Sequence, residues 1–439
     1  MNNRYGTKTN IIKGLEEVIN YQFETYNIDP DFPQNIGSLS ENDFSVEPCS
    51  ERIDFREDPV LTIDCADCKD MDDAVSLQKT PSGYRLSVHI ADVASYVPFG
   101  SDLDKIATYR ATSIYLPGLT VPMLPSVLSN NLCSLNPGVD RLTLSVIMDL
   151  DNNGNILSSN ITKGLIRSRV KGIYTEVNKL ISGSNDENLR SKYSEVIPEL
   201  LEMAKLYKIL RSKRVERGAT VTDTNKPKIT IEKHNVFLAP RADGIAENMI
   251  EEFMILANSV VAEFLYNNDL PAIFRVQEKK NNMAAYQPIK EHHAELALES
   301  YSHFTSPIRR VSDLVISQII SLHLKGVNKQ EIRDLFDEHL IEVCERATKR
   351  SRTAKQVQEK CERYCYEQFF KLHRNYTYTG MLVGFDRKNR AIVQINKYNI
   401  KIIGYALISG KIGSRYSFEV GISNNNSEFV ATRIHKLSA

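Results

Sequence analysis

Apolar and polar residues alternate along the first third of the chain, and this pattern predicts β-strands that are buried on one face. Four segments show it: VLTID (60–64), YRLSVHIADV (84–93), LTLSVIMDLD (142–151) and ILSSNITKGLI (156–166). The last two are separated by DNNGN, a sequence typical of a tight turn, so we expect a hairpin there. Ser101 is placed to cap a short helix over SDLDKIATYRA.

From residue 186 onward, apolar residues recur at helical spacing instead. Three apolar helices are predicted over 200–218, 247–269 and 310–326, the first and last ending at a glycine. A basic, polar helix follows over 330–374. The final segment returns to alternation with Gly and Asn turns, over a length that suits a small five-stranded barrel of the oligonucleotide-binding kind.

These patterns predict an α+β protein with three parts. Residues 1–50 hold one short helix (11–26) and a Pro/Asn/Ser-rich stretch, so we expect an N-terminal arm. Residues 51–374 form the predicted main domain, and residues 375–439 form the predicted barrel.

Composition is that of an ordinary globular protein: 439 residues, 42% hydrophobic and 25% charged. No apolar run reaches the length of about 18 residues that a membrane helix needs, and the N-terminus lacks the apolar core of a secretory signal. The seven cysteines are odd in number and sparse, which favours a reducing compartment. We therefore expect a cytoplasmic protein without a membrane partner.

Charge is distributed unevenly along the chain. Residues 1–100 contain 8 Lys/Arg against 18 Asp/Glu, whereas residues 376–439 contain 9 against 3. A basic C-terminal module suits contact with a polyanion, whereas the acidic part would need metal ions to approach the same partner.

The sequence TIDCADCKDMDDAV (62–75) concentrates aspartates directly after a predicted strand. Carboxylates brought together repel one another, and hard divalent cations such as Mg²⁺ relieve that repulsion. The spacing does not match the EF-hand calcium loop. Paired Mg²⁺ ions about 4 Å apart are a common device for phosphodiester hydrolysis. A solvated acidic turn is the alternative reading of this segment.

Two cysteine pairs could in principle hold zinc. Cys65 and Cys68 form a C-x2-C pair, and Cys361 and Cys365 form a C-x3-C pair. The first pair lies inside the acidic segment and the second on a predicted helix, so we expect thiols rather than a zinc site.

The segment ESYSHFTSPIRRVSDLVISQ (299–318) places Arg309 and Arg310 near a predicted helix start. Pro307 suits the first helical turn and Ser306 could cap it. A helix N-terminus with guanidinium groups suits phosphate. The alternative is an ordinary helix start with exposed arginines.

Together, TIDCADCKDMDDAV and YSHFTSPIRRVSDL resemble the catalytic (RNB) domain of the ribonuclease II, ribonuclease R and Dis3 family of exoribonucleases. The sequence segments between these two motifs also resemble the family and follow in the same order along the chain, so the resemblance covers about 51–374. It implies an α+β domain of mixed sheets and helices around an RNA channel, followed by an S1-type barrel.

Site residues follow from the resemblance. It implies that Mg²⁺, or Mn²⁺ in its place, is held by four aspartates, with Asp72 most critical to catalysis; the four are Asp64, Asp70, Asp72 and Asp73. It implies that Tyr115 in SIYLPG stacks on the RNA end, with a plain packing role as the alternative. Arg309 is the implied phosphate contact, with Arg310 beside it. His89 and Asp92 are expected to be structural.

The implied reaction is hydrolysis of single-stranded RNA from the 3′ end to nucleoside 5′-monophosphates by a two-metal mechanism. We expect a monomer. A catalytically weak RNA-binding or scaffold protein is the main rival, and a metal-dependent endonuclease is a third reading.

The sequence departs from the family pattern at several points. About 50 residues precede the catalytic domain, which is too short for the family's cold-shock barrels, so a partner protein could supply RNA-binding modules. Val311 stands where an aromatic is usual, and no second aromatic clamp is identifiable in GATVTDTNKPKITI. The glutamate expected in the late helix aligns with either Gln358 or Glu359.

Overall fold

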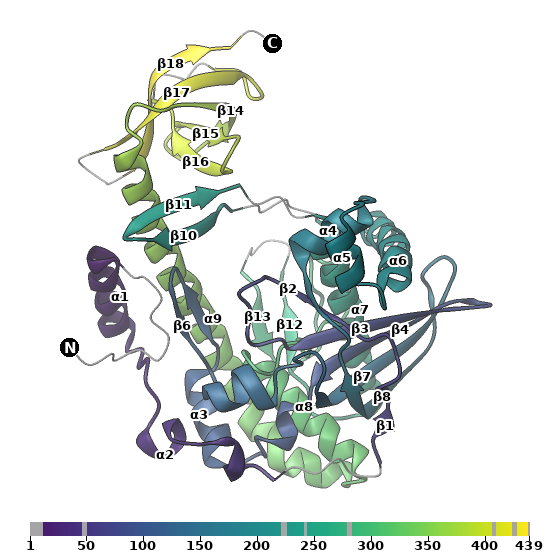
Figure 1. Ribbon diagram of the computed structural model, residues 1–439. Coiled ribbons are helices and arrows are strands. Elements are labelled where there is room, and N and C mark those ends of the chain that lie inside the picture. Colours follow the sequence, from purple (N-terminus) through teal and green to yellow (C-terminus); the bar gives the residue numbers. More distant parts are fainter. Residues whose placement is uncertain are drawn as a thin grey trace.

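A five-stranded sheet lies at the centre of the larger part of the molecule (Figure 1), in a computed structural model that describes residues 12–45, 51–220, 226–240, 244–278, 283–405, 410–423 and 428–437. Its strands in spatial order are β1 (Ile53–Asp54), β8 (Ile156–Arg167), β7 (Asp140–Asp151), β4 (Gly83–Ala91) and β3 (Asp73–Thr80). Neighbours run antiparallel except β1, which joins β8 in parallel.

The strands predicted from alternation are confirmed, but one of them lies outside the large sheet. VLTID contributes β2 (Thr62–Asp64), which lies outside the large sheet and pairs in parallel with β9 (Lys171–Ile173). The predicted hairpin between β7 and β8 is also present. Gly154 closes its turn with a φ of 71°, a left-handed conformation that favours glycine.

Helices cover this sheet and continue beyond it. They are α3 (Asp102–Arg110), α4 (Tyr174–Ile181), α5 (Glu187–Lys192), α6 (Ile197–Glu216), α7 (Ile245–Asn267), α8 (Val311–Leu324) and α9 (Lys329–Leu372). Helix α6 packs on α7 and on β3, and α7 contacts β4 and β7. The predicted helices are confirmed, and the Ser101 side chain caps α3 by accepting from the Asp104 N–H at 3.2 Å.

Smaller elements flank these layers. They are helices α1 (Lys13–Tyr26) and α2 (Gln34–Gly37) and the hairpins β5–β6 (Ile114–Leu116, Leu119–Val121), β10–β11 (Lys228–Glu232, Asn235–Ala239) and β12–β13 (Phe274–Val276, Ala285–Gln287). Helix α1 packs along α9 (Figure 1). Parts of the predicted arm, residues 1–11 and 46–50, lie outside the described residues.

The C-terminal strands close into a five-stranded barrel, as predicted. They are β14 (Thr377–Phe385), β15 (Ala391–Ile395), β16 (Ile400–Ile403), β18 (Phe429–Lys436) and β17 (Arg415–Ile422), in the order β14-β15-β16-β18-β17. The barrel stands at the end of α9, above the β10–β11 hairpin (Figure 1). The fold class is therefore α+β with a small barrel.

Helix α9 joins two hydrophobic cores. Its first half, including Phe336, belongs to the core that also contains the large sheet. Its second half, including Cys361 and Phe370, belongs to a second core shared with α1, the β5–β6 hairpin and the barrel. The hairpin that carries Tyr115 is thus packed in the same core as the barrel.

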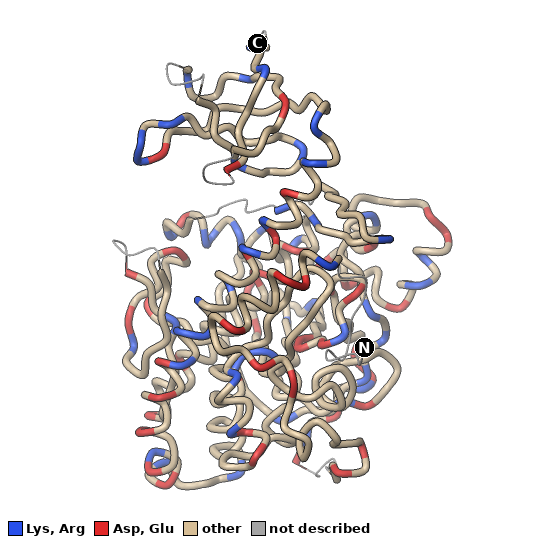
Figure 2. The backbone as a smooth tube through the Cα atoms, turned by 90° about the vertical axis from the view of Figure 1, so that its left-hand side faces the viewer, with Lys and Arg blue, Asp and Glu red and all other residues tan. Residues whose placement is uncertain are grey.

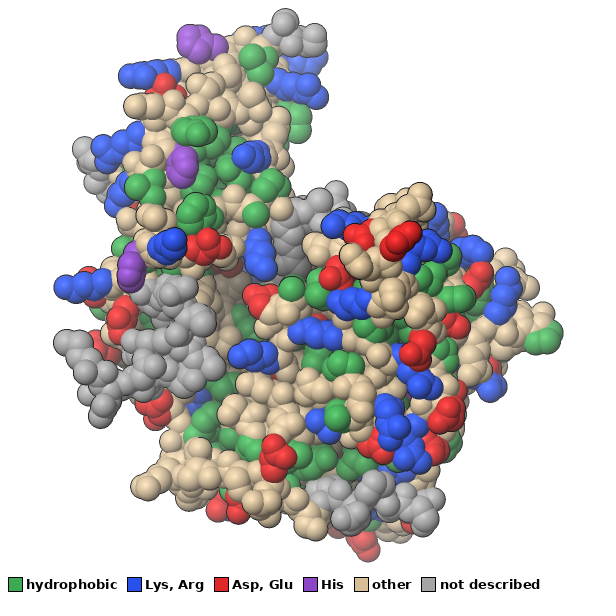
Figure 3. All heavy atoms as spheres, in the orientation of Figure 1, with side chains coloured by type: hydrophobic (Ala, Val, Ile, Leu, Met, Phe, Trp, Pro, Cys, Tyr) green, Lys and Arg blue, Asp and Glu red, His purple; other side chains and the backbone are tan. Residues whose placement is uncertain are grey.

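Basic residues outnumber acidic ones in the C-terminal segment that forms the barrel, and Figure 2 marks both kinds along its backbone. On the face shown in Figure 3, apolar and basic side chains share the barrel surface, and Lys and Arg are scattered over the body below. Within the described residues, no helix has the length and apolarity needed to span a bilayer.

Candidate active site

The four predicted aspartates occupy the end of one strand, a loop and the start of the next strand. Asp64 ends β2 and Asp73 begins β3, with Asp70 and Asp72 in the loop between them. The loop is fixed from outside, because the Ser134 hydroxyl accepts from the Met71 N–H at 3.1 Å and donates to the Lys69 carbonyl at 2.7 Å.

Asp72 is where the two distant motifs meet. Its side chain is 3% exposed, and its Oδ1 accepts from the backbone N–H of Ile308 at 2.8 Å. Its Oδ2 accepts from Nε of Arg309 at 3.1 Å. The structure therefore brings the aspartate segment and the arginine segment, 237 positions apart in sequence, into direct contact.

The guanidinium group of Arg309 is hydrogen-bonded to its neighbours, but a large part of the side chain is exposed to solvent. Its Nη2 donates to the Ser306 hydroxyl at 2.9 Å, while 42% of the side chain remains exposed. Burial lowers the pKa of Arg309, but the charges of Asp72 and its neighbours outweigh this effect and raise it. The guanidinium stays cationic and can still reach a ligand.

The helix start next to these arginines differs from the prediction. Helix α8 begins at Val311 with Arg310 as its N-cap, so Pro307 lies before the helix and Ser306 does not cap it. The positive end of the helix is filled by its own Asp313, which is fully buried. Asp313 Oδ1 accepts from the Ser306 N–H at 2.8 Å and from Arg310 Nη2 at 2.6 Å. The predicted cap by Ser306 and the predicted place of Pro307 in the first helical turn are therefore wrong, and a buried carboxylate pairs with Arg310 at the helix start.

Tyr115 lies on the β5–β6 hairpin and faces the acidic loop. Its hydroxyl donates to Oδ2 of Asp70, and 37% of the residue is exposed. The hairpin is tied to the arginine segment as well, since the Ser113 N–H donates to the Arg309 carbonyl at 3.0 Å. The structure thus brings the predicted stacking residue beside the predicted metal ligands.

Burial and like charge raise the pKa values of Asp64, Asp72 and Asp73. Burial raises the pKa of Asp64 to about 6 and that of Asp72 to about 7, although Arg309 and the Ile308 N–H lower the latter. Burial, then the charges of Asp64 and Asp72, raise the pKa of Asp73 well above its usual range. This crowding would be relieved by a bound cation.

The donor chemistry of the cluster fits Mg²⁺, which prefers carboxylate oxygens. Asp64 also keeps one buried oxygen, Oδ2, without a hydrogen-bond partner. Within the described ranges, however, no three His, Cys, Asp or Glu side chains already converge as a ligand set. The reason is local: Asp72 faces Ile308 and Arg309, and Asp70 faces Tyr115.

Lys171 and Arg275 are parts of the site that the sequence reasoning missed. Lys171, on β9, donates from Nζ to the carbonyls of Ala66 and Cys68 at 3.1 and 2.5 Å, and so holds the acidic loop. Arg275, on β12, stacks over Tyr286 at 4.4 Å. Burial lowers the pKa of Arg275, and nearby Arg310 and Arg352 lower it further. No local sequence signal pointed to either Lys171 or Arg275.

The remaining predicted residues have structural surroundings. His89 is fully buried between Ser76 and Ser145, and Asp92 pairs with Arg52 at 2.6 Å. Cys361 and Cys365 are buried on α9, far along the chain from the acidic loop. Among the described residues, no group of three or more His, Cys, Asp or Glu side chains that could hold a metal ion includes these cysteines.

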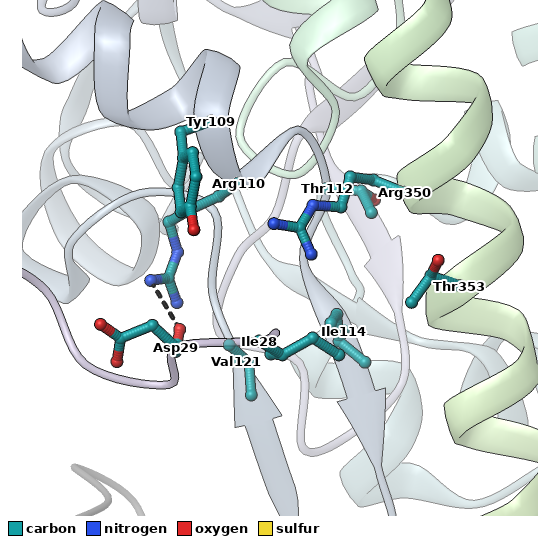
Figure 4. A pocket seen from close by; sticks show the side chains of 9 residues that line it. All are labelled: Ile28, Asp29, Tyr109, Arg110, Thr112, Ile114, Val121, Arg350 and Thr353. Atoms are coloured by element: carbon teal, nitrogen blue, oxygen red, sulfur yellow. Dashed lines mark hydrogen bonds between the residues drawn. The ribbon is translucent and has the colours of Figure 1, made fainter. Parts of the chain in front are cut away.

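A pocket near the N-terminal segment is too small to be an alternative functional site (Figure 4). It lies between α3, the β5–β6 hairpin and α9, with a volume of about 20 Å³, enough for roughly one water. Arg110 projects beside it but is occupied by backbone carbonyls, including that of Asp29 at 3.0 Å.

The fold and site together define an α+β domain with clustered aspartates facing an arginine segment, followed by a five-stranded barrel. Residues 52–287 and 282–326 match the family model of the RNB domain, which is more than half of the chain. The chain belongs to the RNB domain family.

Two kinds of relatives agree with this membership. Ribonuclease R 1 of Lactococcus lactis subsp. lactis is 32% identical over 393 residues, which cover 76% of this chain and 48% of that protein. The chain thus spans about half the length of the curated relatives it matches. The apo form of Mycoplasma genitalium RNase R has a similar structure, with a TM-score of 0.82 at 23% identity over 96% of this chain and 78% of that one.

Yeast Ssd1, described as a pseudonuclease, also shares the fold. Its TM-score is 0.66 at 18% identity, over 92% of this chain and 58% of that chain. The fold alone therefore does not decide between a nuclease and a protein that has lost activity.

Proposed function

We propose that this chain is a divalent-metal-dependent exoribonuclease that hydrolyses single-stranded RNA from the 3′ end and releases nucleoside 5′-monophosphates. The observation that carries the proposal is the meeting of the two motifs at Asp72. Buried carboxylates with raised pKa values stand directly against a cation that keeps an open edge. Such a pairing of acids and guanidinium groups suits a phosphodiester group.

Each residue of the chain has a proposed task. Asp64, Asp70, Asp72 and Asp73 would hold Mg²⁺, or Mn²⁺ in its place, and their number suffices for a pair of ions. Bound metal would supply Lewis acidity and a lowered pKa for an attacking water. Arg309 would donate to the scissile phosphate from its exposed edge and stabilise charge that grows in the transition state.

Tyr115 and the cations around the site support an RNA substrate. A half-exposed tyrosine beside the acids offers a stacking surface that accepts any base. Burial lowers the pKa of Arg275, and the nearby charges of Arg310 and Arg352 lower it further, so three cations gather in a region that suits a polyanion. Selection of RNA over DNA would come from contacts with the ribose 2′-hydroxyl.

The rival proposal is a binding protein that keeps the fold, as the likeness to Ssd1 illustrates. The intact acidic cluster argues against it. A purely binding surface gains nothing from several buried carboxylates whose pKa values are raised by burial and mutual repulsion. An endonuclease differs in its products, since internal cuts give a ladder of fragments.

A digestion of 5′-labelled single-stranded RNA tests the proposal. With Mg²⁺, we expect steady release of nucleoside 5′-monophosphates and a short labelled end-product, and no release in the presence of a chelator. Internal fragments from the earliest time points would replace the proposal by an endonuclease. Binding of RNA without cleavage would replace it by the scaffold reading.

We further propose a monomer in a reducing compartment such as the cytoplasm. The buried cysteines on α9 are thiols, which suits such a compartment. Light scattering of the purified chain, alone and with RNA, tests the monomer, and a partner protein that supplies RNA-binding modules remains a prediction.

A further inference from the structure

The C-x2-C pair in the acidic loop forms a closed turn. The Cys68 N–H donates to the Cys65 carbonyl at 3.1 Å, which makes 65–68 a hydrogen-bonded four-residue turn. Such turns bring their end Cα atoms within about 7 Å, and disulfides span Cα separations of about 4.4–6.8 Å. The backbone therefore already holds the two thiols close to bridging range.

The two cysteines differ in their surroundings. Cys65 is exposed, whereas Cys68 is partly buried and its thiol donates to Oδ1 of Asp70 at 3.6 Å. Hydrogen bonding from the same thiol also lowers the pKa of Asp64, against the larger effect of burial. The Cys68 sulfur thus touches the proposed metal ligands, whereas Cys65 is an exposed residue of the same turn.

The turn is also anchored at its base. Lys171 Nζ donates to the carbonyls of Ala66 and Cys68, and Lys228 Nζ lies 3.7 Å from the Asp67 carboxylate. A covalent change within the turn must therefore be absorbed largely by the side chains and by the adjacent acidic loop, because Lys171 holds two of its backbone carbonyls.

We propose that Cys65 and Cys68 form a redox-sensitive dithiol, which a hydroperoxide converts into a disulfide that weakens the acidic site. The effect on RNA cleavage rests on the proposed function, whereas the formation of the disulfide does not. Transient disulfides of this kind are the form that reducing compartments tolerate.

The chemistry balances with hydrogen peroxide as the oxidant. The exposed Cys65 sulfur attacks one peroxide oxygen, the O–O bond breaks, and a sulfenic acid and one water are formed. The Cys68 sulfur then displaces the sulfenic hydroxyl, which leaves as a second water when the thiol proton is transferred to it, and the S–S bond forms. The two sulfurs lose two electrons in total, and the peroxide gains them.

The consequence for the site follows from the lost thiol proton. A disulfide sulfur cannot donate a hydrogen bond, and it must turn from Asp70 toward Cys65. Asp70 then loses the hydrogen bond from this thiol, and the support that the thiol gives to the neighbouring carboxylates is removed. Loss of an outer contact to metal ligands typically weakens metal affinity or activity about 10- to 100-fold, so we expect at least about a tenfold loss on oxidation.

The chain contains its own control pair. Cys361 and Cys365 lie one turn apart on α9 and are both fully buried. Peroxide has no path to these sulfurs in the folded protein, so they should remain thiols under conditions that oxidise the pair in the loop.

Peptide mapping of the full chain tests the disulfide. After peroxide treatment, denaturation and alkylation, we expect the peptide with Cys65 and Cys68 to be unalkylated and lighter by two hydrogen atoms. The peptide with Cys361 and Cys365 should be alkylated at both positions. Cys65→Ser and Cys68→Ser should each abolish the disulfide. In oxidised wild type, dithiothreitol should reduce the disulfide back to two thiols. Alkylation of both loop cysteines, or oxidation of Cys65 to a sulfinic acid without a bridge, would overturn the proposal.

Mn²⁺ binding and RNA cleavage test the switch. Oxidised wild type should bind Mn²⁺ and cleave RNA at least about tenfold less well than reduced wild type. Cys65→Ser should have the activity of reduced wild type, and peroxide treatment should not change it. A disulfide that changes neither the Mn²⁺ affinity nor the rate of RNA cleavage would overturn the proposal that it weakens the acidic site. If the reduced chain cleaves no RNA, the proposed function fails. Peptide mapping and Mn²⁺ binding then still test whether the disulfide forms and whether it weakens metal binding.

Discussion

At the scale of single residues, Asp72 and Tyr115 connect the acidic loop to segments that are remote in sequence. Asp72 bonds to Ile308 and Arg309, and Tyr115 bonds to Asp70. Each contact consists of one or two hydrogen bonds, so single substitutions can separate the roles of charge, ring and hydroxyl.

Substitution of Tyr115 separates its ring from its hydroxyl. Tyr115→Phe keeps a stacking surface but loses the bond to Asp70, whereas Tyr115→Ala loses both. Because base stacking contributes about 1–3 kcal/mol per base, we expect only the alanine variant to leave a longer final RNA remnant on a sequencing gel. Equal end-products for wild type and Tyr115→Ala would remove the tyrosine from the RNA site.

At the scale of elements, the N-terminus of α8 positions the arginine segment. Asp313 accepts from the Ser306 N–H, from Arg310 and from the Ser312 hydroxyl at 2.9 Å. It therefore fixes both sides of the turn that presents Arg309. The family resemblance identified the arginines, but it did not reveal that an aspartate in the first turn of the same helix holds Arg310 and the Ser306 N–H.

Asp313→Ala should disturb both folding and the site. Removal of one partner of a buried ion pair costs roughly 3 kcal/mol, so we expect a clearly lower urea midpoint together with slower RNA cleavage. Asp337→Ala is the matched control, since Asp337 is exposed on α9 and lies 3.8 Å from Arg333; its effect should be below about 1 kcal/mol. Equal urea midpoints for the two variants would contradict the role of Asp313.

The central sheet carries a buried histidine that makes stability depend on pH. Burial lowers the pKa of His89 to about 3, against about 6.5 in the unfolded chain. Below pH 6.5 the unfolded state binds a proton that the folded state refuses, so stability falls as pH decreases toward 3. At pH 5 this one group accounts for about 2 kcal/mol.

Urea titrations at pH 7 and pH 5 measure this contribution. His89→Gln keeps a polar side chain but removes the titration, so it should lose less stability than wild type between the two pH values. Other acids and histidines affect both proteins alike, and the difference isolates His89. Parallel pH dependence in the two proteins would show that His89 is not buried in its neutral form.

Sequence patterns predicted the elements better than the contacts between them. The four aspartates lie within ten positions, so a strand end and a short loop suffice to gather them. Alternation and helical spacing were equally local, and both were confirmed. Lys171 and the Ile308 N–H reach the loop only because β2 pairs with β9 and because the segment before α8 lies against Asp72. Such contacts depend on tertiary approach and leave no local signal.

At the scale of the whole molecule, the second core ties the barrel to the hairpin that carries Tyr115. The acidic loop and the basic barrel are therefore parts of one assembly rather than independent units. This arrangement supports the expectation that one polyanion contacts both, the acids through metal and the barrel through cations.

Salt dependence of RNA binding tests the part played by the barrel. Lys397 and Lys401 are exposed on the barrel. Lys397→Gln/Lys401→Gln should weaken binding and reduce the slope of log affinity against log salt by about one for each lost phosphate contact. Lys105→Gln/Lys205→Gln removes the same charge from α3 and α6 and should leave the slope unchanged. The same slope change in both variants would show that the barrel has no special part in binding.

The central claim is that the carboxylate of Asp72, where the two motifs meet, is needed for cleavage but not for holding RNA. The most direct measurement compares wild type, Asp72→Asn and the exposed control Asp67→Asn for release of nucleoside 5′-monophosphates and for RNA affinity, with Mg²⁺ present. We predict that Asp72→Asn loses cleavage while its affinity stays within a few-fold of wild type, and that Asp67→Asn keeps both. Cleavage by Asp72→Asn at the wild-type rate would contradict the account.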